Sequence, residues 1–217
     1  RIDSGVIRIR VDIVDDNAPL LQTSVEAGSY RFFREVALTC EDSSGCADIH
    51  YTLDGSTPTT ESDRYTTPLV IAQTTTLKYI AVDGSGNMTD VQSAEYIIDD
   101  MAPTVSVDSP DEGSVESQMI TITGSASDDL SGISTIHLAI DDGINHVQPE
   151  RSLASQPAWL TAEGTENWSL NVSQVPWADE ATYTITVRAT DVAGNDTIST
   201  RSFTFFAGEQ AFSTLSL

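Results

Sequence analysis

The stretch ATYTITVRATD, residues 181–191, alternates apolar and polar side chains from Ala181 to Thr190. Its odd-numbered members from Tyr183 to Ala189 are apolar, and its even-numbered members from Thr182 to Arg188 are polar. Successive side chains of a β-strand point to opposite faces, so this pattern predicts an antiparallel strand with one buried face.

Similar runs rich in Val, Ile, Thr, Tyr and Phe occur along the whole chain, separated by clusters of Gly, Asp, Asn, Ser and Pro. Signals for helices are nearly absent. Many short strands at this spacing predict an all-β fold, either a sandwich or a barrel. The further predicted strands are 5–14, 35–40, 48–54, 75–83, 94–99, 118–127, 133–141, 167–173 and 200–206.

An internal repeat divides the chain. VDDNAP at 14–19 recurs 84 residues later as IDDMAP at 98–103, and AVDGSGN at 81–87 resembles ATDVAGN at 189–195. A proline in each copy restricts the backbone, so we expect short, stiff joints. The predicted organisation is a last strand of a preceding domain or a linker at 1–16, domains at 17–100 and 101–207, and a tail at 208–217.

The charge is strongly acidic, with 33 acidic and 10 basic residues and a net charge of −23. Such a field repels nucleic acid and anionic membranes and attracts cations or basic partners, although acidity for solubility alone is an alternative. No apolar run reaches the roughly 18 residues that a membrane span needs, so we expect no membrane insertion. The chain starts at Arg1 without a signal peptide, and we expect a fragment of a longer protein.

Cys40 and Cys46 are the two cysteines, in the stretch CEDSSGC. Their spacing across a Ser-Gly turn favours a small disulfide loop, which implies an oxidising compartment. A metal site would need further Cys or His nearby, and only His50 is close.

Two resemblances specify the fold further. IHYTLDGSTPT (49–59), YTTPLVI (65–71) and TTTLKYIAVD (74–83) resemble the immunoglobulin-like (Ig-like) module named from the C-terminal domain of chitobiase and β-hexosaminidase. The stretches 103–141 and 183–195 resemble bacterial Ig-like repeats of surface and secreted proteins. Together they imply two tandem immunoglobulin-like antiparallel β-sandwich domains that serve as accessory or spacer modules rather than catalysts.

No catalytic motif stands out. The three histidines form no H-x-x-x-H pattern, and we expect His50 and His137, on predicted strands, at the surface or rim. No nucleophile elbow, phosphate-binding loop or dinucleotide fingerprint occurs. Three tryptophans fall unevenly in 150–178, where core or rim packing is expected and a sugar-stacking platform is the alternative. These are Trp159, Trp168 and Trp177.

Calcium is the cofactor that the acidic pattern suggests. An EF-hand starting at Asp83 fails, because its twelfth residue is Ala94 rather than Glu. In an Ig-like sandwich, however, the entry segment, the B–C loop and the F–G loop share one end, and all three carry acid here. The predicted ligands are Asp15, Asp16, Asp42, Asp83 and Asn87 in the first domain, and Asp99, Asp100, Asp128, Asp129, Asp191 and Asn195 in the second.

Two further interpretations of these acidic segments are open. DDNAP resembles the calcium-binding linkers of cadherins, but DDMAP lacks the Asn. Asp and Asn are also favoured turn residues without any ion, so ordinary turns remain the alternative.

The predicted function is therefore a non-catalytic structural or adhesive spacer of a large bacterial surface or secreted protein, with Ca²⁺ stiffening its domain joints. The alternative is the accessory region, glycan-binding or spacing, of a secreted polysaccharide-degrading enzyme. We expect an extracellular monomer whose partners are neighbouring domains and a surface glycan or protein receptor, with no nucleic acid.

Overall fold

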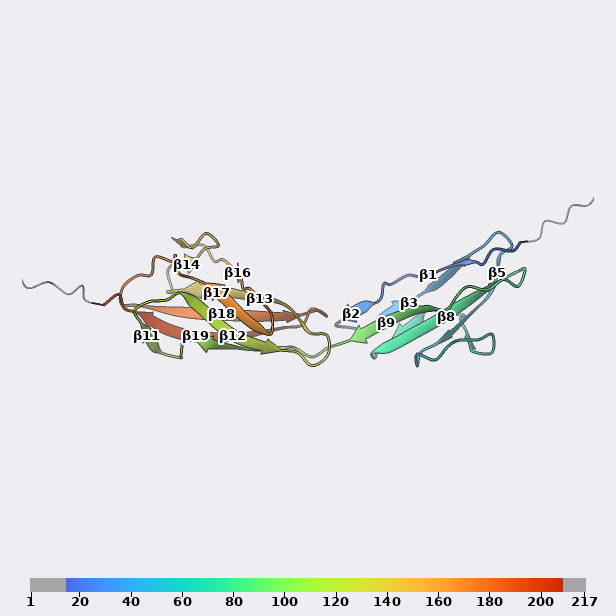
Figure 1. Cartoon of the computed structure of the whole chain (residues 1–217), viewed down its shortest axis with the longest axis horizontal. Helices are drawn as coiled ribbons and strands as arrows, with labels where there is room; N and C mark the ends of the chain where they lie inside the picture. Colours follow the sequence, from blue (N-terminus) through green and yellow to red (C-terminus); the bar gives the residue numbers. More distant parts are fainter. Residues whose placement is uncertain (1–14, 209–217) are drawn as a thin grey trace, which may run out of the picture. The chain divides into compact units, whose positions relative to one another are not determined.

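The computed structural model describes residues 15–208, and every regular element in that range is a β-strand (Figure 1). The predicted all-β fold class is confirmed. Within the described range, no helix has the length and apolarity that a membrane span requires. The strand predicted at 5–14 and nearly all of the tail predicted at 208–217 lie outside the described residues.

The described residues fall into two compact units. Unit 1 comprises residues 15–28 and 33–98, and unit 2 comprises residues 29–32 and 99–208. The main division therefore falls between Ile98 and Asp99, at the start of the second copy of the repeated D-D-x-A-P motif.

Unit 2 is a sandwich of two sheets. One sheet has the order β10-β12-β17, and the other has the order β11-β19-β18-β13-β14-β15 with β16 paired to β13. β11 runs parallel to β19, whereas β18 pairs with both β13 and β19 in antiparallel fashion. The bounds are β10 (Thr104–Ser109), β11 (Ser114–Glu116), β12 (Thr121–Ser127), β13 (Ile133–Asp141), β14 (His146–Val147), β15 (Leu153–Ala154), β16 (Leu160–Thr161), β17 (Asn167–Asn171), β18 (Ala181–Asp191) and β19 (Asp196–Phe205).

The core of unit 2 lies between these sheets. Trp168 of the smaller sheet packs in the same buried cluster as Tyr183 and Phe203 of the larger sheet. The odd-numbered residues of β18 from Tyr183 to Ala189 are all fully buried, as the alternation predicts. Burial of such side chains supplies the main favourable free energy of folding.

Gly124 of β12 makes room for the largest side chain in this core. A Cβ atom at Gly124 would lie 2.0 Å from Cζ2 of Trp168 and 2.1 Å from the carbonyl oxygen of Ser106. Both distances are far inside van der Waals contact, so the close approach of Trp168 to β12 requires glycine at this position.

Unit 1 carries the remaining strands, except that Ser29 and Tyr30 of β2 group with unit 2 although β2 pairs in the sheet of unit 1. The larger sheet has the order β2-β9-β8-β5-β6, and the two short ladders β1-β4 and β3-β7 complete the unit. β3 and β4 are separated by Ala37, which exchanges backbone and side-chain hydrogen bonds with Ser24. The bounds are β1 (Leu20–Thr23), β2 (Gly28–Tyr30), β3 (Arg34–Val36), β4 (Leu38–Glu41), β5 (Cys46–Thr52), β6 (Asp63–Arg64), β7 (Leu69–Ile71), β8 (Thr75–Asp83) and β9 (Gln92–Ile98).

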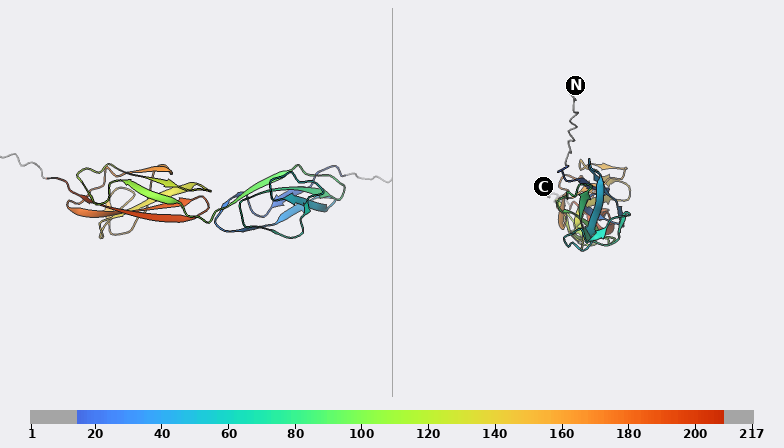
Figure 2. Two further views of the ribbon diagram at one scale, coloured as in Figure 1. Left: turned by 90° about the horizontal axis from the view of Figure 1, so that it is seen from below. Right: turned by 90° about the vertical axis from the view of Figure 1, so that its right-hand side faces the viewer.

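The core of unit 1 draws on both sets of strands. Val36 and Leu38 come from the short ladders, while Leu77 and Tyr96 come from the larger sheet, and all four are buried. The Tyr96 hydroxyl donates a 2.8 Å hydrogen bond to the carbonyl of Val25, which satisfies its polar end. The ribbon views in Figure 2 show the strands of each unit arranged around such an interior.

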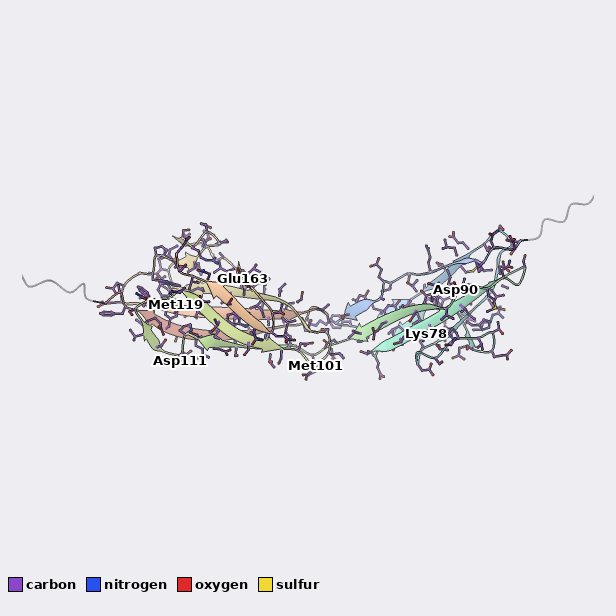
Figure 3. The ribbon with its side chains drawn as sticks, viewed as in Figure 1. Lys78, Asp90, Met101, Asp111, Met119 and Glu163 are labelled. Carbon is purple, nitrogen blue, oxygen red and sulfur yellow. A yellow bond between two sulfur atoms is a disulfide. The ribbon has the colours of Figure 1, made fainter. Side chains whose placement is uncertain are left out.

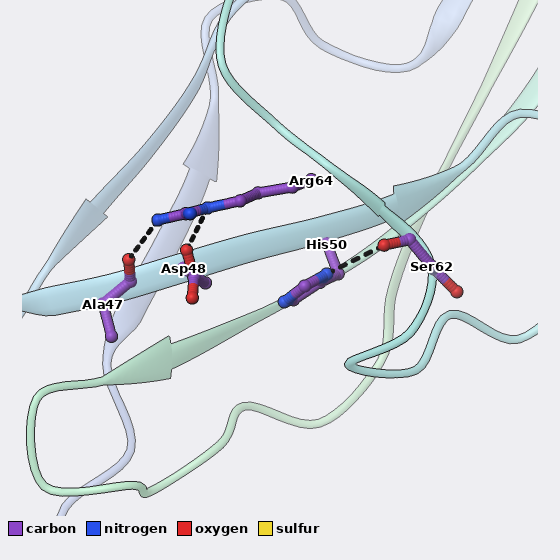
Figure 4. Close-up of polar contacts among 5 residues, drawn as sticks. All are labelled: Ala47, Asp48, His50, Ser62 and Arg64. Atoms are coloured by element: carbon purple, nitrogen blue, oxygen red, sulfur yellow. Dashed lines mark hydrogen bonds and ion pairs between the residues drawn. The ribbon is translucent and has the colours of Figure 1, made fainter.

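The structure corrects the expected position of His50. It was predicted at the surface or rim, but it is only 8% exposed, and its Nδ1 lies 3.0 Å from the carbonyl oxygen of Ser62 (Figure 4). The reason is that the two-residue strand β6 pairs with β5 directly opposite His50 and covers it. Arg64 of β6 also forms an ion pair with Asp48 of β5, so His50 and its neighbours hold β6 in place.

The predicted disulfide between Cys40 and Cys46 is present, with a Cα–Cα distance of 6.1 Å. It closes the loop between β4 and β5. That loop packs against the turn after β8, because Gly84 donates a 2.7 Å hydrogen bond to the Gly45 carbonyl. A Cβ atom at Gly84 would lie 2.6 Å from the Ser44 carbonyl oxygen, so the two loops are in close contact.

Candidate metal centres

Six of the predicted ligands meet in two clusters of three aspartates, one in each unit. Within each cluster, one carboxylate oxygen from each residue lies within 4.8 Å of the others. Each cluster takes one residue from the entry segment, one from the loop before β5 or β13, and one from the end of β8 or β18. The clusters are Asp15, Asp42 and Asp83 in unit 1, and Asp99, Asp128 and Asp191 in unit 2.

Asp191 is placed by the alternation of β18. It continues the core-facing series past Ala189 and is 2% exposed at the end of the sandwich. A buried carboxylate is costly unless it accepts hydrogen bonds. The turn that follows supplies them, because Oδ1 of Asp191 accepts from the backbone of Gly194 at 2.6 Å and of Asn195 at 2.8 Å.

Asp83 has the same construction in unit 1. It ends β8 on the buried face, after Ala81. Its Oδ1 accepts hydrogen bonds from the backbone nitrogens of Ser85 and Asn87, both at 2.8 Å. The D-x-x-G-N turn therefore fixes one carboxylate at the same place in both units.

Loop turns fix the second carboxylate of each cluster. Oδ2 of Asp128 accepts hydrogen bonds from three successive backbone nitrogens, Leu130 to Gly132, at 3.1, 2.9 and 2.8 Å. In unit 1, Oδ1 of Asp42 accepts from the backbone and hydroxyl of Ser44 at 2.7 and 2.8 Å. Such Asx turns form locally, so both loops hold their carboxylates in defined positions.

In each unit, a loop serine donates a hydrogen bond to the entry-segment aspartate, which is the third carboxylate of the cluster. Ser131 donates from its backbone to Oδ2 of Asp99 at 3.1 Å, and Ser43 donates from its hydroxyl to Oδ2 of Asp15 at 2.6 Å. Oδ1 of Asp99 also accepts from the backbone of Met101, which is labelled in Figure 3. Sequence reasoning missed these serines, although both loops carry a Ser-Gly pair after an aspartate, at 44–45 and 131–132, and Ser43 directly precedes the first pair whereas Ser131 begins the second.

The two asparagines of the D-x-x-G-N turns tie each entry segment to its cluster. Nδ2 of Asn195 donates to the carbonyl of Asp99 and to Oδ2 of Asp191, both at 2.8 Å. Nδ2 of Asn87 makes the equivalent bonds to Asp15 and Asp83 at 3.0 and 2.8 Å. Oδ1 of Asn195 is buried and has no hydrogen-bond partner within the described residues.

The other three predicted ligands lie apart from the clusters. Asp16, Asp100 and Asp129 are exposed, although each directly follows a cluster residue in the chain. They therefore provide natural comparison sites for the cluster aspartates.

The donor set of each cluster is anionic and all-oxygen, which suits a hard divalent cation such as Ca²⁺ rather than zinc or copper. Two unit charges 4.8 Å apart repel by about 3 kcal/mol at an effective dielectric constant of about 20. A bound cation would offset this repulsion in unit 2, where Asp99 and Asp191 are buried.

Comparison with protein families supports the division into units. The model of the chitobiase/beta-hexosaminidase C-terminal domain matches residues 25–93, and the model of a bacterial Ig domain matches residues 103–187. These are tandem bacterial Ig-like domains. Ig-like domains are non-catalytic modules, although the first model takes its name from an enzyme family.

Solved structures resemble the Ig-like tandem at low identity. The Clostridium thermocellum CbhA fibronectin(III)-like modules share 17% identity over 86% of this chain and 93% of theirs, with a TM-score of 0.43. Chicken CNTN1 FN1–FN3 shares 16% over 87% and 68%, with a TM-score of 0.42. A tetra-tandem repeat from the extending region of a large adhesion protein shares 17% over 88% and 49%, with a TM-score of 0.41. No curated protein matches the chain.

The three tryptophans of the second Ig-like domain do not form a common platform. Trp168 is in the core, and Trp177 packs edge-on against Tyr183 and Phe203 at centroid distances of 4.8 and 5.5 Å. Core packing of these two agrees with the expectation. Trp159 is separate from them and exposed.

Acid is expected to destabilise the first Ig-like domain when calcium is chelated. Burial acts to raise the pKa of Asp83, but hydrogen bonds from Asn87 and Ser85 outweigh it, and the pKa lies below its usual value. The Ser43 hydroxyl and the Asn17 backbone lower the pKa of Asp15 in the same way. A lowered folded-state pKa contributes stability that is present above the unfolded value of about 3.9 and lost as the pH falls through the folded value.

Denaturant midpoints of unit 1 in a chelator should therefore stay level near neutrality and fall below roughly pH 4. Asp83→Asn should show a shallower fall, because it removes one of the titrating groups. A midpoint that rises on acidification would mean that repulsion among the carboxylates outweighs their hydrogen bonds, contrary to this prediction.

Proposed function

We propose that this tandem is an extracellular structural or adhesive spacer segment of a larger protein, and that each aspartate cluster binds one Ca²⁺ ion. The observation that carries the proposal is the duplication of one construction in two units with different sequences. In both units, an entry aspartate, a loop aspartate and a strand-end aspartate converge, and an asparagine ties down the entry segment.

An extracellular location is supported by the disulfide. Structural disulfides persist in oxidising compartments, and the Cys40–Cys46 bond uses both cysteines of the chain. The family matches to Ig-like modules agree with a role as a spacer or contact surface rather than as a catalyst.

Calcium would act on the segment that joins the two units. Asp99 follows β9 directly, so an ion that holds the Asp99 carboxylate also restricts the backbone between Ile98 and Pro103. Six to eight oxygen ligands surround Ca²⁺ in proteins, and three carboxylates supply three to six of them. Occupied clusters would thus stiffen the tandem, and chelation would loosen it.

Thermal unfolding in excess calcium and in EDTA, at fixed ionic strength, tests this function. A ligand at about a hundred times its Kd that binds only the folded state adds about 2.7 kcal/mol of stability. For a domain of roughly a hundred residues, the melting temperature should rise by about ten degrees or more. Coincident melting curves in calcium and EDTA would refute the calcium sites.

Neighbouring aspartates provide the matched pair of variants. Asp128→Asn should abolish the calcium response of unit 2, whereas Asp129→Asn should preserve it, because Asp129 is exposed and lies outside the cluster. Both variants remove one charge from the same loop. Equal losses in the two variants would indicate a diffuse charge effect in place of a defined site.

Reduction of the disulfide should weaken calcium binding in unit 1 alone. Asp42 lies inside the loop that the disulfide closes, whereas the loop of Asp128 contains no cysteine. Closing a loop of this length removes about 2 kcal/mol of chain entropy. If calcium binding must then order the opened loop, the affinity of unit 1 for calcium falls by up to about thirtyfold. Calorimetric titration before and after reduction measures this, and unit 2 is the internal control.

A further inference from the structure

Trp159 and Arg188 form a stacked pair on the outer face of the larger sheet of unit 2. The guanidinium carbon of Arg188 lies 4.5 Å from the centroid of the Trp159 ring, within the range of a cation–π contact. Trp159 is nevertheless 41% exposed, so part of its indole surface faces solvent. Arg188 belongs to the polar face of β18, and the pair therefore lies outside the core.

The strands beside Arg188 set the surroundings of this pair. Thr161, His137, Arg188 and Ile198 occupy successive register positions across β16, β13, β18 and β19. This row contains no acidic residue, and Ile198 is 56% exposed. The row therefore places the apolar side chain of Ile198 on one side of Arg188 and the imidazole of His137 on the other.

Two polar atoms in this row have no hydrogen-bond partner. Nε of Arg188 and Nδ1 of His137 are buried and unpaired among the described residues. No carboxylate in residues 15–208 forms an ion pair with Arg188. Acidic residues outnumber basic ones 33 to 10, so the missing partner does not reflect a shortage of carboxylates.

His137 contributes a neutral ring. Burial, and to a lesser extent the nearby charge of Arg188, hold the pKa of His137 below its usual value. Near neutral pH the imidazole is therefore an uncharged hydrogen-bonding group beside a permanent positive charge.

Hydroxyl groups flank the row on the same face. Four of the six neighbouring outward-facing positions of β13, β18 and β19 are threonines, whose hydroxyls both donate and accept hydrogen bonds. The other two are Ala139 and the exposed Asp196, and Asp196 forms no ion pair with Arg188. A peptide-binding surface would instead present a larger apolar centre. The flanking threonines are Thr135, Thr186, Thr190 and Thr200.

We propose that this surface, which we call the Trp159–Arg188 face, binds a carboxylate-bearing saccharide such as a uronic-acid oligomer. The planar guanidinium pairs with the sugar carboxylate, an interaction whose geometry favours two parallel hydrogen bonds. The exposed part of Trp159 and the side chain of Ile198 pack against the C–H face of the sugar ring. The site uses no residue of the aspartate clusters, so it is independent of calcium.

Titration with tetragalacturonate and with its methyl ester tests the proposal, because the two ligands share the same sugar chain and the ester replaces each charged carboxylate by a neutral methyl ester. EDTA prevents calcium bridges to the aspartates, and about 0.15 M salt limits the repulsion from the acidic chain to roughly 8 Å. NMR of the Trp159 indole and His137 ring resonances reports the site, and His50 in unit 1 is an internal control.

Saturable shifts of Trp159 and His137 are expected with the uronate, and binding of the ester should be roughly tenfold weaker or undetectable. Arg188→Gln should weaken uronate binding by roughly tenfold or more, and Arg188→Lys by less, because a charge remains. Arg64→Gln, a basic residue of unit 1, should leave binding unchanged. Equal binding of uronate and ester, or absence of saturable shifts in the unmodified chain, would overturn the proposal even if a variant misfolds.

Discussion

Asn195→Asp is expected to destabilise unit 2 by roughly 4 kcal/mol at neutral pH when calcium is chelated. Nδ2 of Asn195 lies 2.8 Å from Oδ2 of Asp191, so the substitution places a second carboxylate oxygen against the first in a buried site. Unit charges at that distance repel by about 6 kcal/mol at an effective dielectric constant of about 20. Protonation limits the loss, because raising a carboxyl pKa from about 4 to neutrality costs about 4 kcal/mol.

Guanidinium unfolding in EDTA measures this loss, and Asn87→Asp is the matched variant. Asn87 occupies the same position in unit 1 but is more exposed, so solvent should screen the added charge and reduce the effect. Saturating calcium should restore much of the stability of both variants, since an ion neutralises the extra carboxylate. An Asn195→Asp chain as stable as the unmodified one in EDTA would contradict the close contact between Asn195 and Asp191.

Gly124→Ala should destabilise unit 2 by about 3 kcal/mol or more, at or beyond the upper end of ordinary overpacking. The new methyl group would clash with Trp168 on one side and with the backbone carbonyl of Ser106 on the other. Trp168 cannot move away, because it is enclosed in the core, and Ser106 is held in the β10–β12 ladder.

Calorimetry should show the unit 2 transition more than about ten degrees lower in this variant, with the unit 1 transition unchanged. Ser127→Ala, on the same strand but exposed, should change stability by less than about 1 kcal/mol. A small effect of Gly124→Ala would show that β12 and Trp168 separate more easily than their packing implies.

Strand alternation predicted the main strands of the fold because a long strand repeats its pattern several times. ATYTITVRATD gives four buried and four outward positions, and β18 follows them throughout. The two-residue strands β6, β14, β15 and β16 were not predicted, since two residues carry no periodicity. The burial of His50 was missed for the same reason, because it depends on β6.

The repeat motifs predicted where both aspartate clusters lie. They did not predict which residue of each Asp-Asp pair points into its cluster. The Asp128 carboxylate points into the cluster because the next three backbone nitrogens after Asp129 donate hydrogen bonds to it. The Asp129 carboxylate has no such donors among the residues that the structure describes. That choice depends on turn geometry rather than on residue type. Trp159 and Arg188 meet only through the pairing of β16 with β13, which no local pattern in the sequence indicates.

The parallel pairing of β11 with β19 has a mechanical consequence. β11 lies near the start of unit 2 and β19 at its end, and their three register pairs run from Ser114–Phe203 to Glu116–Phe205. When the two ends of the unit are pulled apart, tension draws these strands in opposite directions along their length. The ladder hydrogen bonds are then loaded in shear and must break together, whereas a peeled hairpin loses them one at a time. Unit 2 is therefore built to resist force along the chain.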